Sequence, residues 1–307
     1  MKLIIQDTAY HQEGRTVLYV PKEAFAEVEK DATDKEMVTR LESLVVHWTR
    51  QIKEVLNSNQ NSSDSGDRST PIDEIRYWKA RCDDLSGIYQ QLHDMQLNKI
   101  LNILEYAKSP YLDHFRRSAD LINSGTLEAQ DNLKFLNILV DPCETLDTYE
   151  PKEIHQVMPK LVHYVRFIWA NSKYYNSNER VVGLLQKINN QVINRCIERI
   201  SLQDIFFKDV LASVKHLEEC IVACEAWKAL YKEMSRTYWQ YDENSIFAQL
   251  EAFIQRCRDL LEICEAQVQF ARKTEGGEKF PLPQFGNTQK IDLSKGYVVS
   301  TNSHPFL

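Results

Sequence analysis

The clearest pattern in the chain lies in residues 75–92, where large apolar side chains recur three and four positions apart. Because the residues between them are mostly charged or carry amides, the apolar side chains share one face of a predicted helix. Thr70 suits a helix cap and Pro71 suits a first turn, so the helix is predicted to begin there. We interpret the pattern as a stripe that packs against other helices rather than as the wall of an active site. The stripe consists of Ile75, Trp78, Cys82, Leu85, Tyr89 and Leu92.

The same spacing recurs along most of the chain, from Leu41, Trp48 and Ile52 near the start to Phe253 and Cys257 near the end. Short polar segments or Pro and Gly residues separate one periodic segment from the next. The predicted helices cover residues of about 34–56, 71–108, 110–123, 126–140, 151–174, 178–199, 202–239 and 243–272.

Three segments lack this period. Thr16–Pro21 is typical of a short strand, which we expect to pair with Leu3–Ile5. Residues 57–69 are rich in Ser and Asn and predict a mobile loop. Residues 274–307 predict an extended C-terminal segment.

Helices joined by short connections pack as antiparallel neighbours. We therefore predict an all-α chain that forms an elongated array of antiparallel helical bundles, with a short β-hairpin-like segment at its N-terminus. The predicted organisation is residues 1–33 as the end of a small module, residues 34–273 as the helical bundle, and residues 274–307 as the extended segment.

Composition excludes several classes of protein. The net charge of -7 over 307 residues does not support nucleic-acid binding. No run of 18 apolar residues predicts a membrane span, and the apolar run in MKLIIQDTAY is too short for a signal peptide. We therefore expect a reducing compartment, in which the seven cysteines, mostly at apolar helical positions, are free buried thiols.

Motifs for catalysis are missing from the sequence. The GxxxxGK[ST] loop that cradles phosphate is absent, and Glu275–Phe280 (EGGEKF) does not replace it. Cys220 and Cys224 have a spacing that a metal site could use, but they also continue an apolar stripe. We predict no catalytic, cofactor-binding or metal-binding residues and no small-molecule substrate. An enzyme with a dispersed site around His155, His163 and Cys220 is the rival hypothesis.

Aromatic residues are dense around 164–175 and 227–241, where they form either a binding hot spot or bundle core. The residues expected in helix seams or against partner chains are Trp48, Ile52, Ile75, Trp78, Leu85, Tyr89, Leu92, Trp169, Trp227 and Tyr231.

The segment IRYWKARCDDLSGIYQQL, with Glu74 before it, resembles a segment near the N-terminus of dynein heavy chains. The pattern rests on Glu74, Ile75, Trp78, Arg81, Asp84, Leu85, Ile88, Tyr89, Gln91 and Leu92. Further segments are similar to the same family, and the axonemal branch fits better than the cytoplasmic one. They are Leu41–Leu56, Phe135–Leu146, Ile168–Cys196 and Pro281–Thr288, so that the resemblance covers about residues 36–288.

The resemblance implies a tail of α-helical bundles, in the axoneme of a cilium or flagellum, that holds heavy chains together and carries intermediate and light chains. Residues 1–33 correspond to the end of the family's N-terminal dimerisation module. The family's motor ring, ATP sites and microtubule-binding stalk lie far downstream, so the resemblance implies no motor activity here. The last 18 residues depart from the family pattern, which predicts a fragment or truncated form. A stand-alone helical scaffold or coiled-coil adaptor is the second rival.

Overall fold

A computed structural model describes most of the chain, namely residues 10–12, 15–21, 25, 27–58, 68–207, 210–238 and 241–273. The predicted all-α class is confirmed, since helices account for nearly all of this part. Two three-residue strands, β1 (Tyr10–Gln12) and β2 (Arg15–Val17), pair antiparallel with Tyr10 opposite Val17. The strand predicted at Thr16–Pro21 shares only its first two residues with β2, and its predicted partner Leu3–Ile5 lies outside the described residues.

The chain divides into two compact units, a division that the sequence pattern did not predict. The first unit comprises Met1–Gly66, Asp73–Asn137 and Ser172–Tyr174, and the second comprises Asp67–Ile72, Ile138–Asn171 and Tyr175–Leu307. The first two residues of the loop predicted at 57–69 end a helix, and residues 59–67 lie outside the described residues. The predicted extended segment 274–307 also lies outside them.

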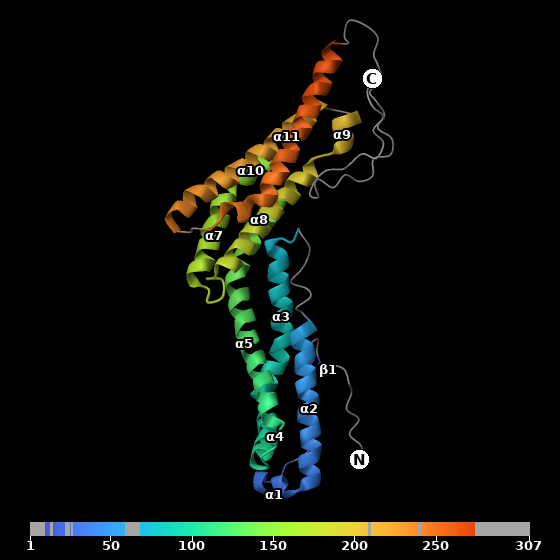
Figure 1. The fold of residues 1–307 in the computed structure, drawn as a ribbon, viewed down its shortest axis with the longest axis vertical. Helices are drawn as coiled ribbons and strands as arrows, with labels where there is room; N and C mark the ends of the chain where they lie inside the picture. The colour runs from blue at the N-terminus through green and yellow to red at the C-terminus, as the bar shows by residue number, and fades with distance from the viewer. Residues whose placement is uncertain are drawn as a thin grey trace. The chain divides into compact units, whose positions relative to one another are not determined.

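In the part of the chain that the structure describes, the first unit contains five helices (blue to green in Figure 1). Apolar residues of these helices pack into one shared core. Its core joins Leu44, Val45 and Trp48 to residues of the later helices and to Leu18 from the segment after β2. These side chains are buried because the spacing of three and four puts them on the inner face of each helix. The helices are α1 (Val28–Thr33), α2 (Lys35–Ser58), α3 (Pro71–Leu92), α4 (Met95–Tyr106) and α5 (Leu112–Leu136).

The second unit is arranged around one helix, α8 (Asn178–Arg199), which contacts α6, α7, α10 and α11. Helices α10 and α11 run in opposite directions, since ion pairs join Glu225 to Arg258, Lys228 to Glu251 and Lys232 to Glu243. The remaining elements are η2 (Asn137–Leu139), α6 (Val140–Thr148), η3 (Pro151–Gln156), α7 (Met158–Asn171), α9 (Leu202–Phe207), α10 (Val210–Tyr238) and α11 (Glu243–Lys273). No helix in the described residues combines the length and apolar character that a membrane crossing requires.

The prediction of one helix from Pro71 to about Lys108 is wrong, because the chain breaks between α3 and α4. Asp94 caps α4, with its side chain accepting a hydrogen bond from the Gln96 amide at 3.2 Å. Short polar side chains such as Asp favour a cap over a helix interior. The apolar spacing continues across the break, so periodicity alone did not reveal it.

The predicted break at Asn123–Gly125 is also wrong, because α5 runs straight through it. A Cβ atom on Gly125 would lie 3.2 Å from Leu85 Cδ1, so glycine leaves room on α5 for the Leu85 side chain of α3. Packing between helices here outweighs the weak helix propensity of glycine. Elsewhere the prediction of 178–199 matches α8, whereas the region predicted as 151–174 is divided into η3 and α7.

Candidate functional site

Trp48, at the centre of the first unit, illustrates how the predicted seam residues are used. Its side chain is fully buried, its ring centroid lies 5.8 Å from that of Phe115, and its Nε1 donates to the Tyr19 carbonyl at 2.8 Å. Ile52 and Leu85 fill the same core. These predicted residues therefore join the chain's own helices.

The second unit has an equivalent centre on α10. Trp227 and Tyr231 are fully buried, and Phe247 of α11 packs edge-on to both, with ring centroids 6.4 Å and 5.1 Å away. Trp227 Nε1 donates to Asn189 Oδ1 at 2.6 Å. Trp227 and Tyr231 of this aromatic group therefore form bundle core rather than a binding hot spot.

The other predicted residues are less enclosed. Ile75 is buried, whereas Trp78, Tyr89, Leu92 and Trp169 are half-buried and keep part of their surface accessible. Trp78 Nε1 donates to Glu74 Oε1 at 3.4 Å within the same helix. Packing of these four side chains against a partner chain stays a prediction.

Three consecutive buried amides on α8 were missed by the sequence analysis. Asn189 donates to the Ile246 carbonyl at 2.6 Å, and Asn190 donates to the Ser69 carbonyl at 3.0 Å. Gln191 donates to the Cys143 carbonyl at 2.9 Å and to Asp147 at 2.8 Å. Because successive helical residues point about 100° apart, the three amides reach three different neighbours. In the sequence they read as ordinary polar residues.

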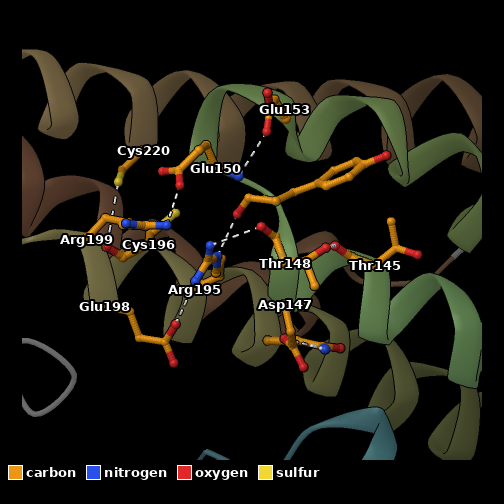
Figure 2. A network of polar contacts seen from close by, with 12 residues as sticks. Thr145, Asp147, Thr148, Glu150, Glu153, Arg195, Cys196, Glu198, Arg199 and Cys220 are labelled. Carbon is orange, nitrogen blue, oxygen red and sulfur yellow. Dashed lines mark hydrogen bonds and ion pairs between the residues drawn. The ribbon is translucent and has the colours of Figure 1, made fainter.

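One turn further along α8, Arg195 ties α8 to the connection between α6 and η3 (Figure 2). Its guanidinium donates to the Tyr149 and Thr148 carbonyls at 2.6 Å and 3.3 Å and pairs with Glu198 at 3.0 Å. Only 10% of the Arg195 side chain is exposed, and its bond to the Tyr149 carbonyl is partly shielded from water. The site therefore positions two elements relative to each other.

A second arginine completes this network. Arg199 pairs with Glu150, the residue that caps η3. Glu150 and Glu153 form a capping box, in which the Glu153 carboxylate accepts from the Glu150 amide at 3.2 Å. Glu150 therefore satisfies the start of η3 and anchors it to α8 at the same time.

The cysteines are all free thiols, and six of the seven are buried in the second unit. Cys220 Sγ lies 3.8 Å from the Cys196 carbonyl. A hydrogen bond with Cys196 and burial raise the pKa of Cys220, and burial raises the pKa of Cys257 to about 12. These thiols therefore stay protonated and unreactive. Within the described residues, no group of three or more His, Cys, Asp or Glu side chains could hold a metal ion.

The rival enzyme site is not assembled in this arrangement. His155 and His163 are exposed, whereas Cys220 is fully buried. His155 Nδ1 lies 2.7 Å from the Lys152 carbonyl, a contact within its own turn. A nucleophilic cysteine needs a base within hydrogen-bond reach and a lowered pKa, and Cys220 has the opposite shift.

Comparison with known proteins places the chain. The family described as "Dynein heavy chain, N-terminal region 1" matches residues 38–298.

The chain belongs to the dynein heavy chain family.

Among its relatives, the dynein-1-beta heavy chain of the flagellar inner arm I1 complex from Chlamydomonas reinhardtii is 42% identical over 298 residues, covering 95% of this chain and 6% of that protein. The dynein axonemal heavy chain 2 of Mus musculus is 46% identical over 185 residues, covering 60% of this chain and 4% of that protein. The ciliary dynein beta chain of Tripneustes gratilla is 30% identical over 299 residues, covering 90% and 7%.

The predicted resemblance to the axonemal branch is thus confirmed. The dynein chain described here spans 4% to 7% of the length of these three relatives.

Proposed function

We propose that the chain acts as a non-catalytic assembly segment in the tail of an axonemal dynein heavy chain. In this role it contributes to association between heavy chains and to the binding of intermediate and light chains, in a ciliary or flagellar axoneme. The observation that carries the proposal is the match of residues 38–298 to the N-terminal region of the family. The ciliary and flagellar names of the relatives support the location.

The mechanism we propose is packing of helix against helix, without chemistry. The fully buried stripe residues make each unit rigid, and the apolar residues left on the surface supply contacts for another chain. Such residues occur in both units. They include Leu121, Leu127, Leu211, Val222 and Ile263, which are exposed by 44% to 66%.

We further propose that the units belong to an elongated array of antiparallel bundles. The opposite directions of α10 and α11, which are evident from the residues that three ion pairs join, support this arrangement for one helix pair. Short connections between successive helices favour it for others. Small-angle scattering of the purified chain would test it, because an array gives a larger radius of gyration than a sphere of 307 residues.

The function is tested by capture from ciliary extract with the tagged 307-residue chain. We expect dynein heavy, intermediate or light chains among the bound proteins, identified by mass spectrometry. A variant with Leu127→Gln and Val222→Gln should capture less, because two exposed apolar contacts are lost. The matched control is Asn98→Gln, an exposed polar position on α4. A chain that stays monomeric at high concentration and captures no dynein subunit would refute the assembly role.

A stand-alone helical scaffold is the second candidate, since each unit has its own buried core. Transcript mapping separates the two functions. If coding sequence for further tail and a motor ring adjoins this segment, the stand-alone scaffold is excluded. If no such coding sequence adjoins it, the stand-alone scaffold is favoured.

A further inference from the structure

The four residues that follow β2, Leu18–Pro21, lie against three helices of the first unit, and we call them the docked segment. The Leu18 side chain is only 2% exposed and shares a core with Trp48 of α2. Pro21 is also buried, whereas Tyr19 is 44% exposed. The docked segment therefore places its first and last side chains against the helices and turns one outward.

One glutamine of α3 binds the backbone of the docked segment through both of its polar atoms. Gln91 Oε1 accepts a hydrogen bond from the Leu18 amide at 2.6 Å, and Gln91 Nε2 donates to the Leu18 carbonyl at 2.9 Å. Facing residues of antiparallel strands exchange the same two bonds, so the side chain of Gln91 takes the place of a neighbouring strand.

Two further side chains bind carbonyl groups of the docked segment. Trp48 Nε1 of α2 donates to the Tyr19 carbonyl at 2.8 Å, and Gln96 Nε2 of α4 donates to the Pro21 carbonyl at 3.2 Å. The break between α3 and α4 lies between Gln91 and Gln96, whose side chains bind opposite ends of the segment. Three helices thus each supply one side chain, and three of the four carbonyls of the segment are bonded.

These contacts have the two parts of a peptide-recognition site, in which hydrogen bonds to the main chain give affinity and places for side chains give specificity. The first position selects an aliphatic side chain, because a charge at the buried Leu18 would be left without compensation. The fourth position suits proline, which has no N–H to satisfy and favours an extended backbone at the residue before it.

We propose that Trp48, Gln91 and Gln96, with the apolar core beneath Leu18, form a binding site for a short peptide segment that has a bulky aliphatic residue first and proline fourth. The resident ligand is the docked segment of this same chain. It is held as a ligand is held, so it can leave the helices without unfolding them. This proposal goes beyond the assembly role and does not depend on it.

The first test measures binding of a detached ligand to the whole 307-residue chain. The probe is a fluorescent peptide with the sequence of residues 14–22. The wild-type chain should not bind it, because the tethered segment competes at an effective concentration on the order of millimolar. Leu18→Asp removes this competitor and should bind the peptide, whereas a peptide that carries the same Leu18→Asp change should not bind.

Matched variants then locate the peptide on the chain. Adding Gln91→Ala to Leu18→Asp should weaken peptide binding by about tenfold or more, because two hydrogen bonds are lost. The matched control adds Gln130→Ala, an exposed glutamine on α5, and should leave binding unchanged. Circular dichroism should show that Leu18→Asp keeps its helices.

A second measurement needs no peptide. Hydrogen exchange of the Leu18 amide should be slow in the wild type and about tenfold faster in Gln91→Ala, while the amides at the centre of α2 keep their rates. Gln130→Ala is again the control and should leave the Leu18 amide as slow as in the wild type.

Four results would overturn the proposal. They are loss of the helices in Leu18→Asp, no binding of the peptide to that variant, binding that ignores Gln91→Ala, and an exchange rate at Leu18 that ignores it. If the wild type instead sediments as a dimer that Gln91→Ala dissociates, the ligand is the segment of a second copy and the assignment within one chain fails. Capture of dynein subunits from extract is measured separately, so failure of this proposal and failure of the assembly role are distinguishable.

Discussion

The two units bury polar side chains in different ways. In the first unit, buried hydroxyls bond to their own helix: Thr49 donates to the Val45 carbonyl and Thr126 to the Ile122 carbonyl, each at 2.8 Å. In the second unit, the buried amides of α8 bond to residues 44 to 121 positions away. These two hydroxyl bonds of the first unit are therefore local to single helices, although Trp48 Nε1 reaches the Tyr19 carbonyl, whereas the amide bonds of the second unit specify which elements meet.

This difference has a physical consequence. A hydroxyl bonded to its own helix leaves apolar packing to decide how helices pair, and such packing tolerates sliding and substitution. An amide that must reach one carbonyl on another element fixes the register, because leaving it unsatisfied costs about 1–3 kcal/mol. The first unit does use long-range polar bonds at one edge. There Gln91 binds the backbone of Leu18 through both its amide atoms, at 2.6 Å and 2.9 Å.

The largest effect is expected from the two buried tryptophans. Trp227→Ala and Trp48→Ala should each destabilise their unit by about 3–5 kcal/mol, because a large cavity is left. The Trp→Phe variants should differ in how much they destabilise the two units. Trp227→Phe leaves Asn189 Oδ1 without its donor in a buried site and should cost about 2 kcal/mol, whereas Trp48→Phe frees only the carbonyl of Tyr19, a half-exposed residue, and should cost less. Hydrogen exchange of the amides in each unit measures these costs, and equal costs would contradict the comparison.

Alkaline pH should weaken the second unit more than the first. Burial raises the pKa of Cys143 and of Cys257 to about 12, and unfolded thiols ionise near pH 8.5. Their contribution to stability is therefore complete below about pH 8.5 and falls as pH rises toward 12, by about 2 kcal/mol for each thiol at pH 10. The unfolding free energy of Cys257→Ala should drop less between pH 8 and pH 10 than that of the wild type. Cys82→Ala, at a half-buried site in the first unit, is the control and should change this drop less.

Sequence pattern predicted the helices where one amphipathic stripe is bounded by clear signals, as in α8 and α11. It failed where a tertiary contact decides the outcome. Gly125 reads as a break and is a close contact with Leu85. A local contact was missed as well: Asp94 falls inside the helix predicted over residues 71–108, but it caps the start of α4. The contacts of the candidate site were even harder to predict from the sequence. Asn190 and Ser69 are 121 positions apart, and Leu18 and Gln91 are 73 apart, so no local spacing records either contact.

The amides themselves offer a direct comparison. Asn189→Ala removes a hydrogen bond to the Ile246 carbonyl and leaves the Trp227 N–H without an acceptor. It should therefore destabilise the protein by about 2 kcal/mol. Asn132 on α5 is also fully buried, but its side-chain oxygen and nitrogen have no hydrogen-bond partner in the described residues. Asn132→Ala removes an unsatisfied group and gains helix propensity, so it should be neutral or slightly stabilising. Chemical denaturation of both variants measures the contrast, and a cost for Asn132→Ala above that for Asn189→Ala would refute it.

Two helical glycines should differ by a smaller amount. A Cβ added to Gly183 on α8 meets nothing within 4 Å, so Gly183→Ala should stabilise the protein by about 1 kcal/mol. The same change at Gly125 brings the Cβ to 3.2 Å from a Leu85 methyl group, which must shift, so the gain should be smaller. Gly125→Val should be destabilising because the methyl groups overlap Leu85 more severely. Thermal unfolding of the three variants orders them, and a larger gain at Gly125 than at Gly183 would show that α3 and α5 are not closely packed there.

The smallest effect is expected at the surface of the α10–α11 pair. Glu225 and Arg258 form an ion pair with both side chains about half exposed. A double-mutant cycle with Glu225→Gln and Arg258→Gln should give a coupling free energy below about 0.5 kcal/mol that vanishes in 1 M salt. The exchanged pair, Glu225→Arg with Arg258→Glu, should restore it. If the coupling instead exceeds 2 kcal/mol and persists in salt, surface charge rather than the buried contacts of Phe247 with Trp227 and Tyr231 fixes the direction of these helices. Surface ion pairs, rather than buried amides, would then set the register of the helices in the second unit. The difference between the two units would be refuted.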